Sequence, residues 1–208
     1  SHAAWDIGAR DVAEGLSRAL DAPLVESRIS RLVYDCNRPP EAPDAMPPRS
    51  ERFDIPGNEG LSEAQRAARV REVFDPFSAL LAQVIADRTA PPVLITVHSF
   101  TPVYLGRRRE VQIGILHDTD TRLADAMLDV AVRHTGLIVR RNEPYGPDDG
   151  VTYTLRRHGI AHGLVNVMIE IRNDLLSAEG DRADMAAMLS GWLTQAIDAL
   201  DQPGKRTP

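Results

Sequence analysis

The segment VNVMIEIRNDLL, residues 165–176, places charged side chains inside an apolar run. Its β-branched residues and methionine are typical of a strand in a parallel sheet that is covered on both faces. Glu170 and Arg172 are two positions apart, so both side chains point to the same face of this strand. A buried charge is costly unless it is paired, binds a metal or takes part in chemistry. Glu170 is therefore the first candidate for a functional residue.

Strands and helices alternate along the rest of the chain. Apolar runs predict core strands at 92–100, 111–118 and 136–142, and two short β-rich pieces within 22–35. Helical spacing of apolar residues predicts helices at 6–20, 61–88, 121–134 and 181–200. This alternation predicts an α/β fold, in which one three-layer domain spans residues 1–208 with a mostly parallel or mixed central sheet and helices on both faces.

Capping residues and prolines give more detailed predictions for two helices and one loop. Ser62 and Gln65 form a capping box at the start of the helix at 61–88, and Pro76 is expected to break or kink this helix. Its second half then has one apolar stripe, made of Phe77, Leu80, Leu81, Val84 and Ile85. Asp181 is expected to cap the last helix, whose apolar stripe predicts core packing by Met185, Met188, Leu189 and Trp192. The loop at 37–60 is proline-rich over 37–58, which predicts either an ordered functional loop or a disordered one.

Composition limits the class of function. A chain of 208 residues with 43% hydrophobic content can bury one substantial core. A net charge of -6 argues against a nucleic-acid surface, and no apolar stretch is as long as a membrane span. The single cysteine fits a reducing cytoplasm. A small-molecule partner, with no nucleic acid and no membrane, is the expectation.

Polar residues that follow apolar runs are the candidates for chemistry, because active sites of such folds lie beyond the carboxyl ends of the strands. His98 can ligate zinc through one ring nitrogen, or it can be a hydrogen-bonded loop histidine. Asn37 and Arg38 suit a substrate carboxylate, but Arg38 can equally pair with Asp35 to fasten the proline-rich loop.

Other polar residues favour structural explanations. Cys36 has no nearby base and is expected to be a small buried residue. Asp118 and Asp120 resemble a magnesium pair, but Asp120 directly precedes a helix and is expected to cap it. The triplet 107–109 is expected in a solvated hairpin, from which an arginine could reach an anionic substrate.

Several motifs, in order, resemble the N-formylglutamate amidohydrolase family of zinc-dependent deformylases. They are SRLVYDCNRPP (30–40), HSFTPVYLGRRREVQIGILHDTDTRLADAML (98–128), NEPYG (142–146) with VTYTLRRHG (151–159), and IEIRNDL (169–175). The opening SHAAWDIGA (1–9) is similar to an early helix of that family. Because the family is related to the zinc carboxypeptidases, the resemblance implies a zinc-carboxypeptidase-like fold.

The resemblance also implies roles for single residues. Asn37 and Arg38 would hold the substrate carboxylate, His98 would bind zinc, and Glu170 would be the general base. The candidates for donors to the oxyanion are Arg172, Tyr145 and His158. Ser99, Arg109 and His158 are expected to contact the substrate. Asp6 is either a second metal ligand or a helix cap. The family's upstream histidine motif would precede Ser1, so either the remaining zinc ligands lie outside this sequence or this molecule does not hold zinc in the normal way.

The reaction implied by the resemblance is hydrolysis of the formyl amide of N-formylglutamate or a similar N-acyl amino acid. Zinc would lower the pKa of a water molecule so that Glu170 can take its proton, and the products would be formate, or another acid, and the free amino acid. Two alternatives stay open. One is a metal-free ligand-binding pseudoenzyme of the same fold, and the other is a zinc amidase or peptidase for a different acyl group.

Overall fold

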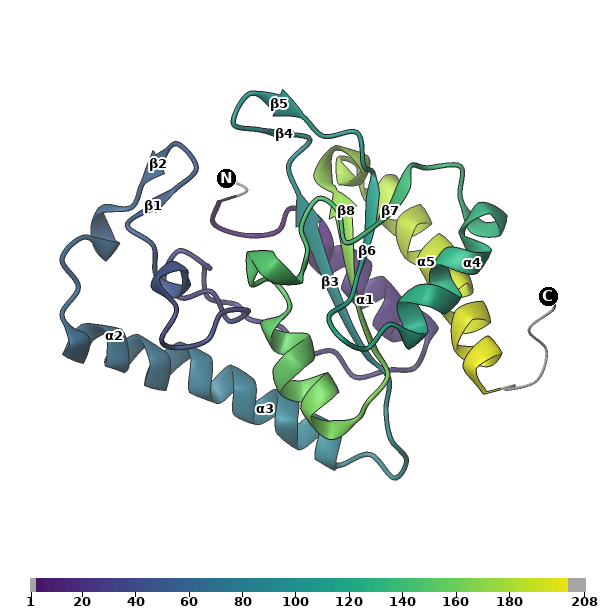
Figure 1. The fold of residues 1–208 in the computed structure, drawn as a ribbon, viewed down its shortest axis with the longest axis horizontal. Helices are drawn as coiled ribbons and strands as arrows, with labels where there is room; N and C mark the ends of the chain where they lie inside the picture. Colours follow the sequence, from purple (N-terminus) through teal and green to yellow (C-terminus); the bar gives the residue numbers. More distant parts are fainter. Residues whose placement is uncertain (1–2, 202–208) are drawn as a thin grey trace.

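The computed structural model describes residues 3–201, and its centre is a four-stranded mixed sheet (Figure 1). The strands are β3 (Leu94–Phe100), β6 (Ile113–Leu116), β7 (Val139–Arg141) and β8 (Asn166–Arg172), in the order β3-β8-β6-β7. β8 is parallel to β3 and antiparallel to β6, and β6 is parallel to β7. The predicted fold class, with a mixed sheet between helices, is confirmed.

Three helices cover one face of the sheet. They are α1 (Ala9–Ala19), α4 (Arg122–His134) and α5 (Glu179–Leu200). Val167, Ile169 and Ile171 of β8 join one buried apolar cluster with residues of all three helices. Trp192 of α5 is fully buried there and donates a hydrogen bond from Nε1 to the carbonyl of Met127 at 2.7 Å. The predicted core stripe of the last helix is therefore confirmed.

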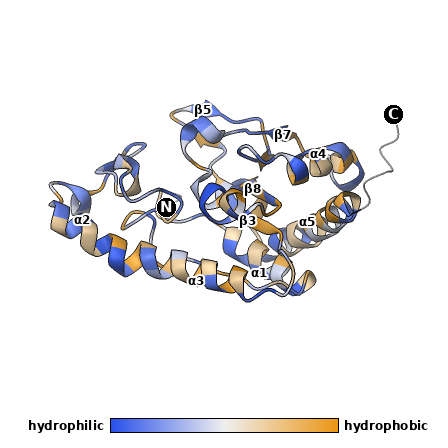
Figure 2. Ribbon diagram, turned by 60° about the horizontal axis from the view of Figure 1, so that its bottom comes forward, coloured by the Kyte–Doolittle hydropathy of each residue, from blue (hydrophilic) through white to orange (hydrophobic). Residues whose placement is uncertain are grey.

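The other face is covered by α3 (Asp75–Ala86) and by the irregular segment 151–163. Leu81 of α3 and Leu155 form a second buried cluster with residues of three strands, namely Leu94, Leu116 and Met168. Figure 2 shows hydrophobic and hydrophilic residues alternating along α3, as expected of a helix with one face on a core. The buried apolar cluster on this face is smaller than the first, and the polar side chains of Glu170 and Arg172 lie on the same face of β8 as Met168.

The proline-rich loop is folded and carries its own small core. Its elements are β1 (Arg49–Ser50), β2 (Phe53–Asp54) and two short 3-10 turns, and it leads into α2 (Glu63–Arg69). Tyr34, Ala45, Met46 and Phe74 are buried together under it. Of the two predicted options, the ordered loop is the one observed. Another hairpin, β4 (Val103–Tyr104) with β5 (Arg107–Arg108), follows β3 as predicted.

The prediction of strands within 22–35 is wrong. Residues 22–35 form turns and extended loop rather than strands, because their backbone pairs with turns and with the N-terminal segment, as in the bond from Arg31 N–H to the Ala4 carbonyl. At Pro76 the chain stays helical, but the regular α-helix is interrupted directly before this residue. A π-helical turn at Val70–Phe74 joins α2 to α3, and Pro76 lies in the first turn of α3, where its missing N–H is tolerated.

Two predictions about single helical residues also need correction. Leu80 is 54% exposed and does not join the apolar stripe of α3, since that side of the helix faces away from the sheet. Asp181 does not precede α5 but lies in its first turn, where its carboxylate accepts the backbone N–H of Ala178 at 3.0 Å. The capping box of Ser62 and Gln65 is confirmed at the start of α2.

Candidate active site

Glu170 and His98 are neighbours on the two parallel strands at the edge of the sheet. The register pairs them directly, so their side chains lie on the same face. Glu170 is only 6% exposed, and its Oε2 has no hydrogen-bond partner among residues 3–201. Burial raises the pKa of Glu170 to about 7, although the positive charges of His98, Arg31 and Arg109 partly oppose this rise. The side chain can therefore accept and release a proton near neutral pH.

His98 is oriented by a carboxylate from the start of the chain. Its Nδ1 lies 2.7 Å from Oδ2 of Asp6. Burial lowers the pKa of His98, but the bond to Asp6 and the charge of Asp6 outweigh it, so the pKa is raised overall. Asp6 does not cap a helix, because α1 begins after Gly8 and has no side-chain cap. A histidine that bonds a carboxylate through one nitrogen is the usual arrangement of a metal ligand, which binds through the other nitrogen.

Arg31 connects this pair to the proline-rich loop. Its Nη1 donates to Oδ1 of Asp6 at 2.8 Å, and its Nη2 donates to Oδ2 of Asp35 at 2.7 Å. Asp35 in turn accepts the backbone N–H of Asn37 at 2.9 Å. Sequence reasoning missed Arg31, although it lies in the motif SRLVYDCNRPP, because its partner Asp6 is 25 residues upstream.

Asn37 and Arg38 are engaged with the chain itself. The Asn37 amide donates to the carbonyl of Val151, and its oxygen accepts the N–H of Thr154 at 2.9 Å. Arg38 donates from Nε to Asp44 at 2.6 Å and from Nη1 to the Gly150 carbonyl at 3.0 Å. Both residues therefore fasten the loop to the segment that covers the sheet. The loop-fastening alternative for Arg38 had named Asp35 as partner, but the partner is Asp44.

Tyr145 and Arg109 lie on the polar face of the sheet near Glu170. Nη1 of Arg109 donates to the Tyr145 hydroxyl at 2.9 Å. Burial raises the pKa of Tyr145, and the charge of Glu170 raises it further, while Arg109 opposes both. Tyr145 therefore keeps its proton at neutral pH. Gly114 pairs with Glu170 on β6 and lies against the loop that carries Tyr145. A side chain at position 114 would collide with the carbonyl of Glu143 in that loop.

Arg172 is buried but does not pair with Glu170. Its Nε donates to Asp174 at 2.8 Å, and its Nη1 donates to the carbonyls of Arg109 and Glu110 at 3.0 and 3.3 Å. The guanidinium is thus used to anchor the chain after the β4–β5 hairpin. Its predicted role as a donor to the oxyanion is not supported by these contacts.

Two of the predicted site residues lie apart from this group. His158 contacts Ser78 of α3 at 3.2 Å, and burial, aided by Arg157 and His162, lowers its pKa to about 4. Ser99 points to the opposite face of the sheet and donates to the carbonyl of Ile7 at 2.8 Å. Neither arrangement supports the predicted contact with substrate.

Cys36 and Asp120 behave as structural residues. Burial raises the pKa of the Cys36 thiol to about 11, which disfavours a nucleophilic thiolate. Asp120 accepts the N–H of Arg122, the first residue of α4, at 3.1 Å, but the N-cap of α4 is Thr121 and no side chain caps this helix, so the predicted capping role of Asp120 is wrong.

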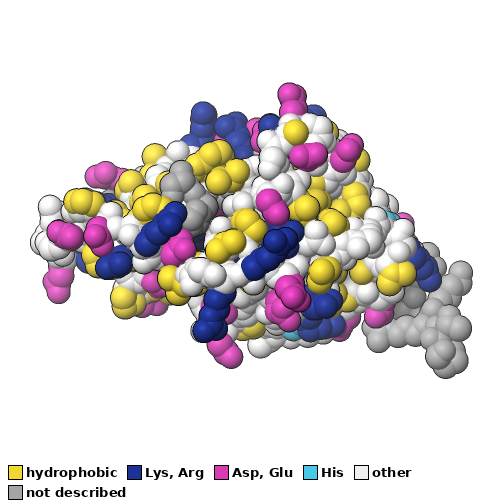
Figure 3. All heavy atoms as spheres, turned by 90° about the horizontal axis from the view of Figure 1, so that it is seen from above, with side chains coloured by type: hydrophobic (Ala, Val, Ile, Leu, Met, Phe, Trp, Pro, Cys, Tyr) yellow, Lys and Arg dark blue, Asp and Glu magenta, His cyan; other side chains and the backbone are white. Residues whose placement is uncertain are grey.

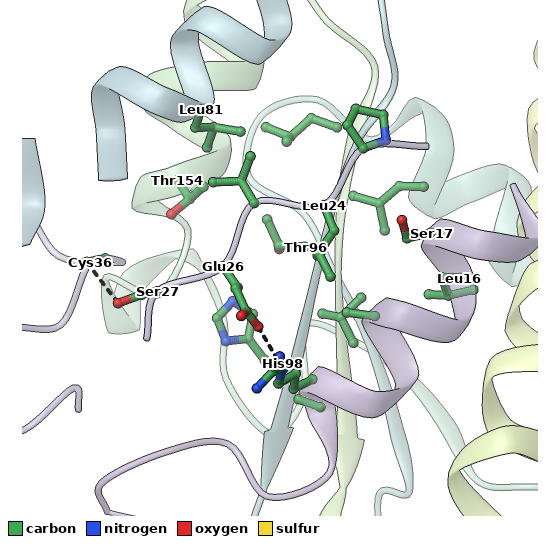
Figure 4. Close-up of a pocket in the computed structure, with 18 of the residues that line it drawn as sticks. Leu16, Ser17, Leu24, Glu26, Ser27, Cys36, Leu81, Thr96, His98 and Thr154 are labelled. Atoms are coloured by element: carbon green, nitrogen blue, oxygen red, sulfur yellow. Dashed lines mark hydrogen bonds and ion pairs between the residues drawn. The ribbon is translucent and has the colours of Figure 1, made fainter. Parts of the chain in front are cut away.

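A cavity of about 950 Å³ lies beside the edge strand β3. Asp6, Arg31 and His98 contribute to its wall, and much of the remainder is apolar. Figure 4 shows His98 and Thr96 of β3 among the side chains that line it, together with residues of α1, of α3 and of the loop that follows α1. A small molecule could therefore approach His98 from this side.

The described residues fit part of a zinc site. Within residues 3–201, no three His, Cys, Asp or Glu side chains are grouped so that they could hold a metal ion together. The unpartnered Oε2 of Glu170 and the oriented ring of His98 nevertheless offer a donor atom each on one face. A catalytic zinc usually takes three protein ligands, so these residues would supply only some of them.

A family model for N-formylglutamate amidohydrolase matches residues 1–177. The chain belongs to this family. Among solved structures, gene product Atu2144 from Agrobacterium tumefaciens is 56% identical, with a TM-score of 0.94 over 97% of this chain and 81% of that chain. The N-formylglutamate amidohydrolase from Ralstonia eutropha JMP134 is 17% identical and shares the fold, with a TM-score of 0.54 over 93% of this chain and 80% of that chain. No curated protein matches the sequence.

The molecule is therefore an amidohydrolase, as the motifs predicted. Within residues 3–201, this amidohydrolase has no helix that is long and apolar enough to cross a membrane. Figure 3 shows acidic and basic side chains interspersed over the face seen from above. This face offers no continuous basic surface of the kind that nucleic-acid binding requires.

Proposed function

We propose that this amidohydrolase releases formate from N-formylglutamate or a closely similar N-acyl amino acid, with zinc as its cofactor. The observation that carries the proposal is the buried Glu170 carboxyl, which has an unpartnered oxygen and a pKa near 7 beside the carboxylate-oriented His98. A carboxyl in this state is suited to general acid–base chemistry on an amide. The single cysteine supports a reducing compartment such as the cytoplasm.

Glu170 would act twice in the reaction. As a base it takes a proton from the water that attacks the formyl carbon. As an acid it then gives the proton to the departing amine, so that formate and the free amino acid leave. The absence of an ion pair between Glu170 and Arg172 supports this role, because a carboxylate fixed by a guanidinium would have a lowered pKa and would be a weaker base.

His98 would hold zinc through Nε2, since Asp6 uses Nδ1. When bound, the zinc would supply Lewis-acid activation of the water and of the formyl group. Both oxygens of Asp6 are already engaged, Oδ1 by Arg31 and Oδ2 by His98, which favours Asp6 as the residue that orients His98 over Asp6 as a direct ligand.

Tyr145 would donate a hydrogen bond to the oxyanion that forms on the formyl oxygen. Its hydroxyl oxygen accepts from Arg109, which leaves the O–H proton free to be donated. The neighbouring positive charge of Arg109 makes that proton a better donor.

The test uses the full-length protein, purified with zinc present. Formate or acid release is followed with N-formyl-, N-acetyl- and N-succinylglutamate, and metal content is measured by elemental analysis. We expect formate release from the formyl substrate, about one zinc per chain, and loss of both in His98→Ala. His162→Ala is the matched control, because His162 is exposed.

Each contrary result has a separate meaning. Undiminished zinc in His98→Ala would remove His98 from the metal site. Cleavage of an acetyl or succinyl substrate, with the formyl substrate untouched, would replace the proposed acyl group with another. Binding of the substrate without hydrolysis, by a protein that takes up no zinc, would favour the metal-free pseudoenzyme.

A further inference from the structure

Arg109 is a cation held in a ring of aromatic side chains. Its Cζ lies 5.6 Å from the ring centre of Phe100, 4.6 Å from that of Tyr104 and 4.8 Å from that of Tyr145. Its hydrogen bonds go to the Tyr145 hydroxyl and to the Thr101 carbonyl, the latter a long contact of 3.5 Å. Aromatic faces orient a guanidinium without neutralising its charge.

No carboxylate pairs with this guanidinium in the part of the chain that the structure describes, residues 3–201. The side chain is partly buried, so it is shielded from bulk water on the sides that face the rings. A positive charge that is fixed, partly desolvated and unpaired attracts an anion more strongly than an exposed surface arginine does.

The backbone of Arg109 is anchored to the strand that carries Glu170. Arg172, at the end of β8, donates to the carbonyls of Arg109 and Glu110, and its charge is balanced by Asp174. Phe100, which lies under Arg109, is two residues after His98 on the same face of β3. The position of the guanidinium is therefore fixed relative to β3 and β8, the two strands that carry His98 and Glu170.

Arg109 is also electrostatically close to the reacting group. Its positive charge lowers the pKa of Glu170 and so opposes the much larger effect of burial. Tyr145 contacts Arg109 directly and is itself influenced by the charge of Glu170. Arg109 and Tyr145 therefore belong to the same charged environment as Glu170.

Comparison with Arg38 shows why Arg109 is the better receptor for an anion. The motif DCNRPP suggested Arg38 for the substrate carboxylate, but Arg38 already pairs with the Asp44 carboxylate and donates to the Gly150 carbonyl. Arg109 has the same donor fork and contacts no anion among the described residues. A substrate carboxylate at Arg38 would have to displace Asp44, whereas one at Arg109 would displace only water and a weak carbonyl contact.

We infer that Arg109 is the residue that binds a carboxylate of the substrate and makes this site selective for anionic acyl amino acids. The inference rests on the proposed function for the position of the substrate, and it replaces Arg38 in that role. The carboxylate can be either the α-carboxylate or the side-chain carboxylate of the glutamate, and the chemistry of recognition is the same for both.

The first experiment compares Arg109→Gln and Arg109→Lys with Arg108→Gln. Arg108 is an exposed residue of the same hairpin and serves as the matched control. On N-formylglutamate we expect kcat/KM to fall roughly 10- to 150-fold in Arg109→Gln, mainly through KM, and by a smaller factor in Arg109→Lys, since an ammonium keeps the charge but loses the fork. Arg108→Gln should match the wild type.

Substrate analogues identify the carboxylate. N-formylglutamine lacks the side-chain carboxylate, and N-formylisoglutamine lacks the α-carboxylate. On the analogue that lacks the carboxylate bound by Arg109, the wild type and Arg109→Gln should have similar kcat/KM values. On the other analogue, the wild type should keep the higher kcat/KM. An equal loss on all three substrates, or no loss on any of them, would overturn the inference.

A binding measurement separates this inference from the proposed reaction. Calorimetric titration of N-formylglutamate into Glu170→Gln, with and without Arg109→Gln, does not require turnover. Weaker binding in the double variant supports the inference even if the wild type fails to release formate. Equal binding in the two variants, both with unchanged melting temperatures, refutes it while leaving the proposed reaction intact.

Discussion

The two faces of β8 differ although both are buried. One face presents Val167, Ile169 and Ile171 to three helices, and its residues form one continuous apolar cluster. The other presents Met168, Glu170 and Arg172 to a layer formed by α3 and the irregular segment 151–163, where the apolar cluster is smaller. Burial alone does not distinguish the faces, because every residue of the strand is buried. The difference lies in what packs opposite.

The two charged residues on this face of β8, Arg172 and Glu170, differ in whether other groups compensate their charge. Arg172 is compensated by Asp174 and by two carbonyls, so it serves the structure. Glu170 is left with an unpartnered oxygen, so its burial costs stability that the fold recovers elsewhere. A protein retains such a group where its altered pKa is useful. Four measurements can break or sharpen this contrast.

The largest expected effect is that of Glu170→Gln on the charged face. The rate of formate release should fall roughly 100- to 10,000-fold, because the amide keeps the shape but cannot act as a base. The melting temperature should hardly change, since Arg172 does not depend on Glu170. Steady-state kinetics and thermal unfolding of one variant provide both values. A large loss of stability with activity retained per folded molecule would return Glu170 to a structural role.

The next effect is on the apolar face, one residue away. Ile169→Ala should lower the free energy of unfolding by about 2–5 kcal/mol, because it leaves a cavity in a fully buried cluster. Ile169→Val removes one methylene and should cost about 0.5–1.5 kcal/mol. Chemical denaturation measures both variants. Activity per folded molecule should be that of the wild type, and a specific loss of activity would show that the two faces are coupled.

A smaller effect concerns His158, which is buried in the segment 151–163 and contacts Ser78 of α3. Its pKa of about 4 lies below the ordinary 6.5, so the unfolded chain takes up the proton first as the pH falls. Stability contributed by neutral His158 is therefore present above about pH 6.5 and is lost toward pH 4, by up to about 3 kcal/mol.

Denaturation curves of the wild type and His158→Gln across this pH range provide the check. The variant should show less loss of stability between pH 6.5 and pH 4. Because the charge of His162 contributes to the low pKa of His158, His162→Gln serves as the comparison and should reduce the pH dependence by less than His158→Gln does. Parallel curves for the wild type and His158→Gln would show that His158 is not the group responsible.

The smallest effect is expected from Arg38→Lys. Because Arg38 holds the loop through Asp44 and Gly150, the substitution should cost about 1 kcal/mol of stability. The change in kcat/KM on N-formylglutamate should be well below that of Arg109→Gln. Both quantities come from the assays already described. A KM effect larger than that of Arg109→Gln would restore Arg38 as the carboxylate receptor.

Several features of fold and site could be predicted because they depend on residues within a few positions of one another. The two-residue period of β8 put Glu170 and Arg172 on one face, and the capping box of Ser62 and Gln65 marked the start of a helix. The prediction of strands within residues 22–35 was wrong because a strand depends on more than its local sequence. Their β-branched residues favour a strand locally, but a strand also needs a partner with a free edge, and this segment bonds to turns instead.

By itself, the sequence determined the alternation of strands and helices, the family and the identity of the candidate base. Tertiary structure alone decided which side chains meet: Asp6 with His98, 92 residues apart, and Arg109 with Tyr145, 36 residues apart. It also paired Arg38 with Asp44, while Arg109 meets Tyr145 and no carboxylate within residues 3–201. The physical reason is that periodicity and capping arise from local backbone geometry, whereas the partner of a charged side chain depends on how distant segments pack.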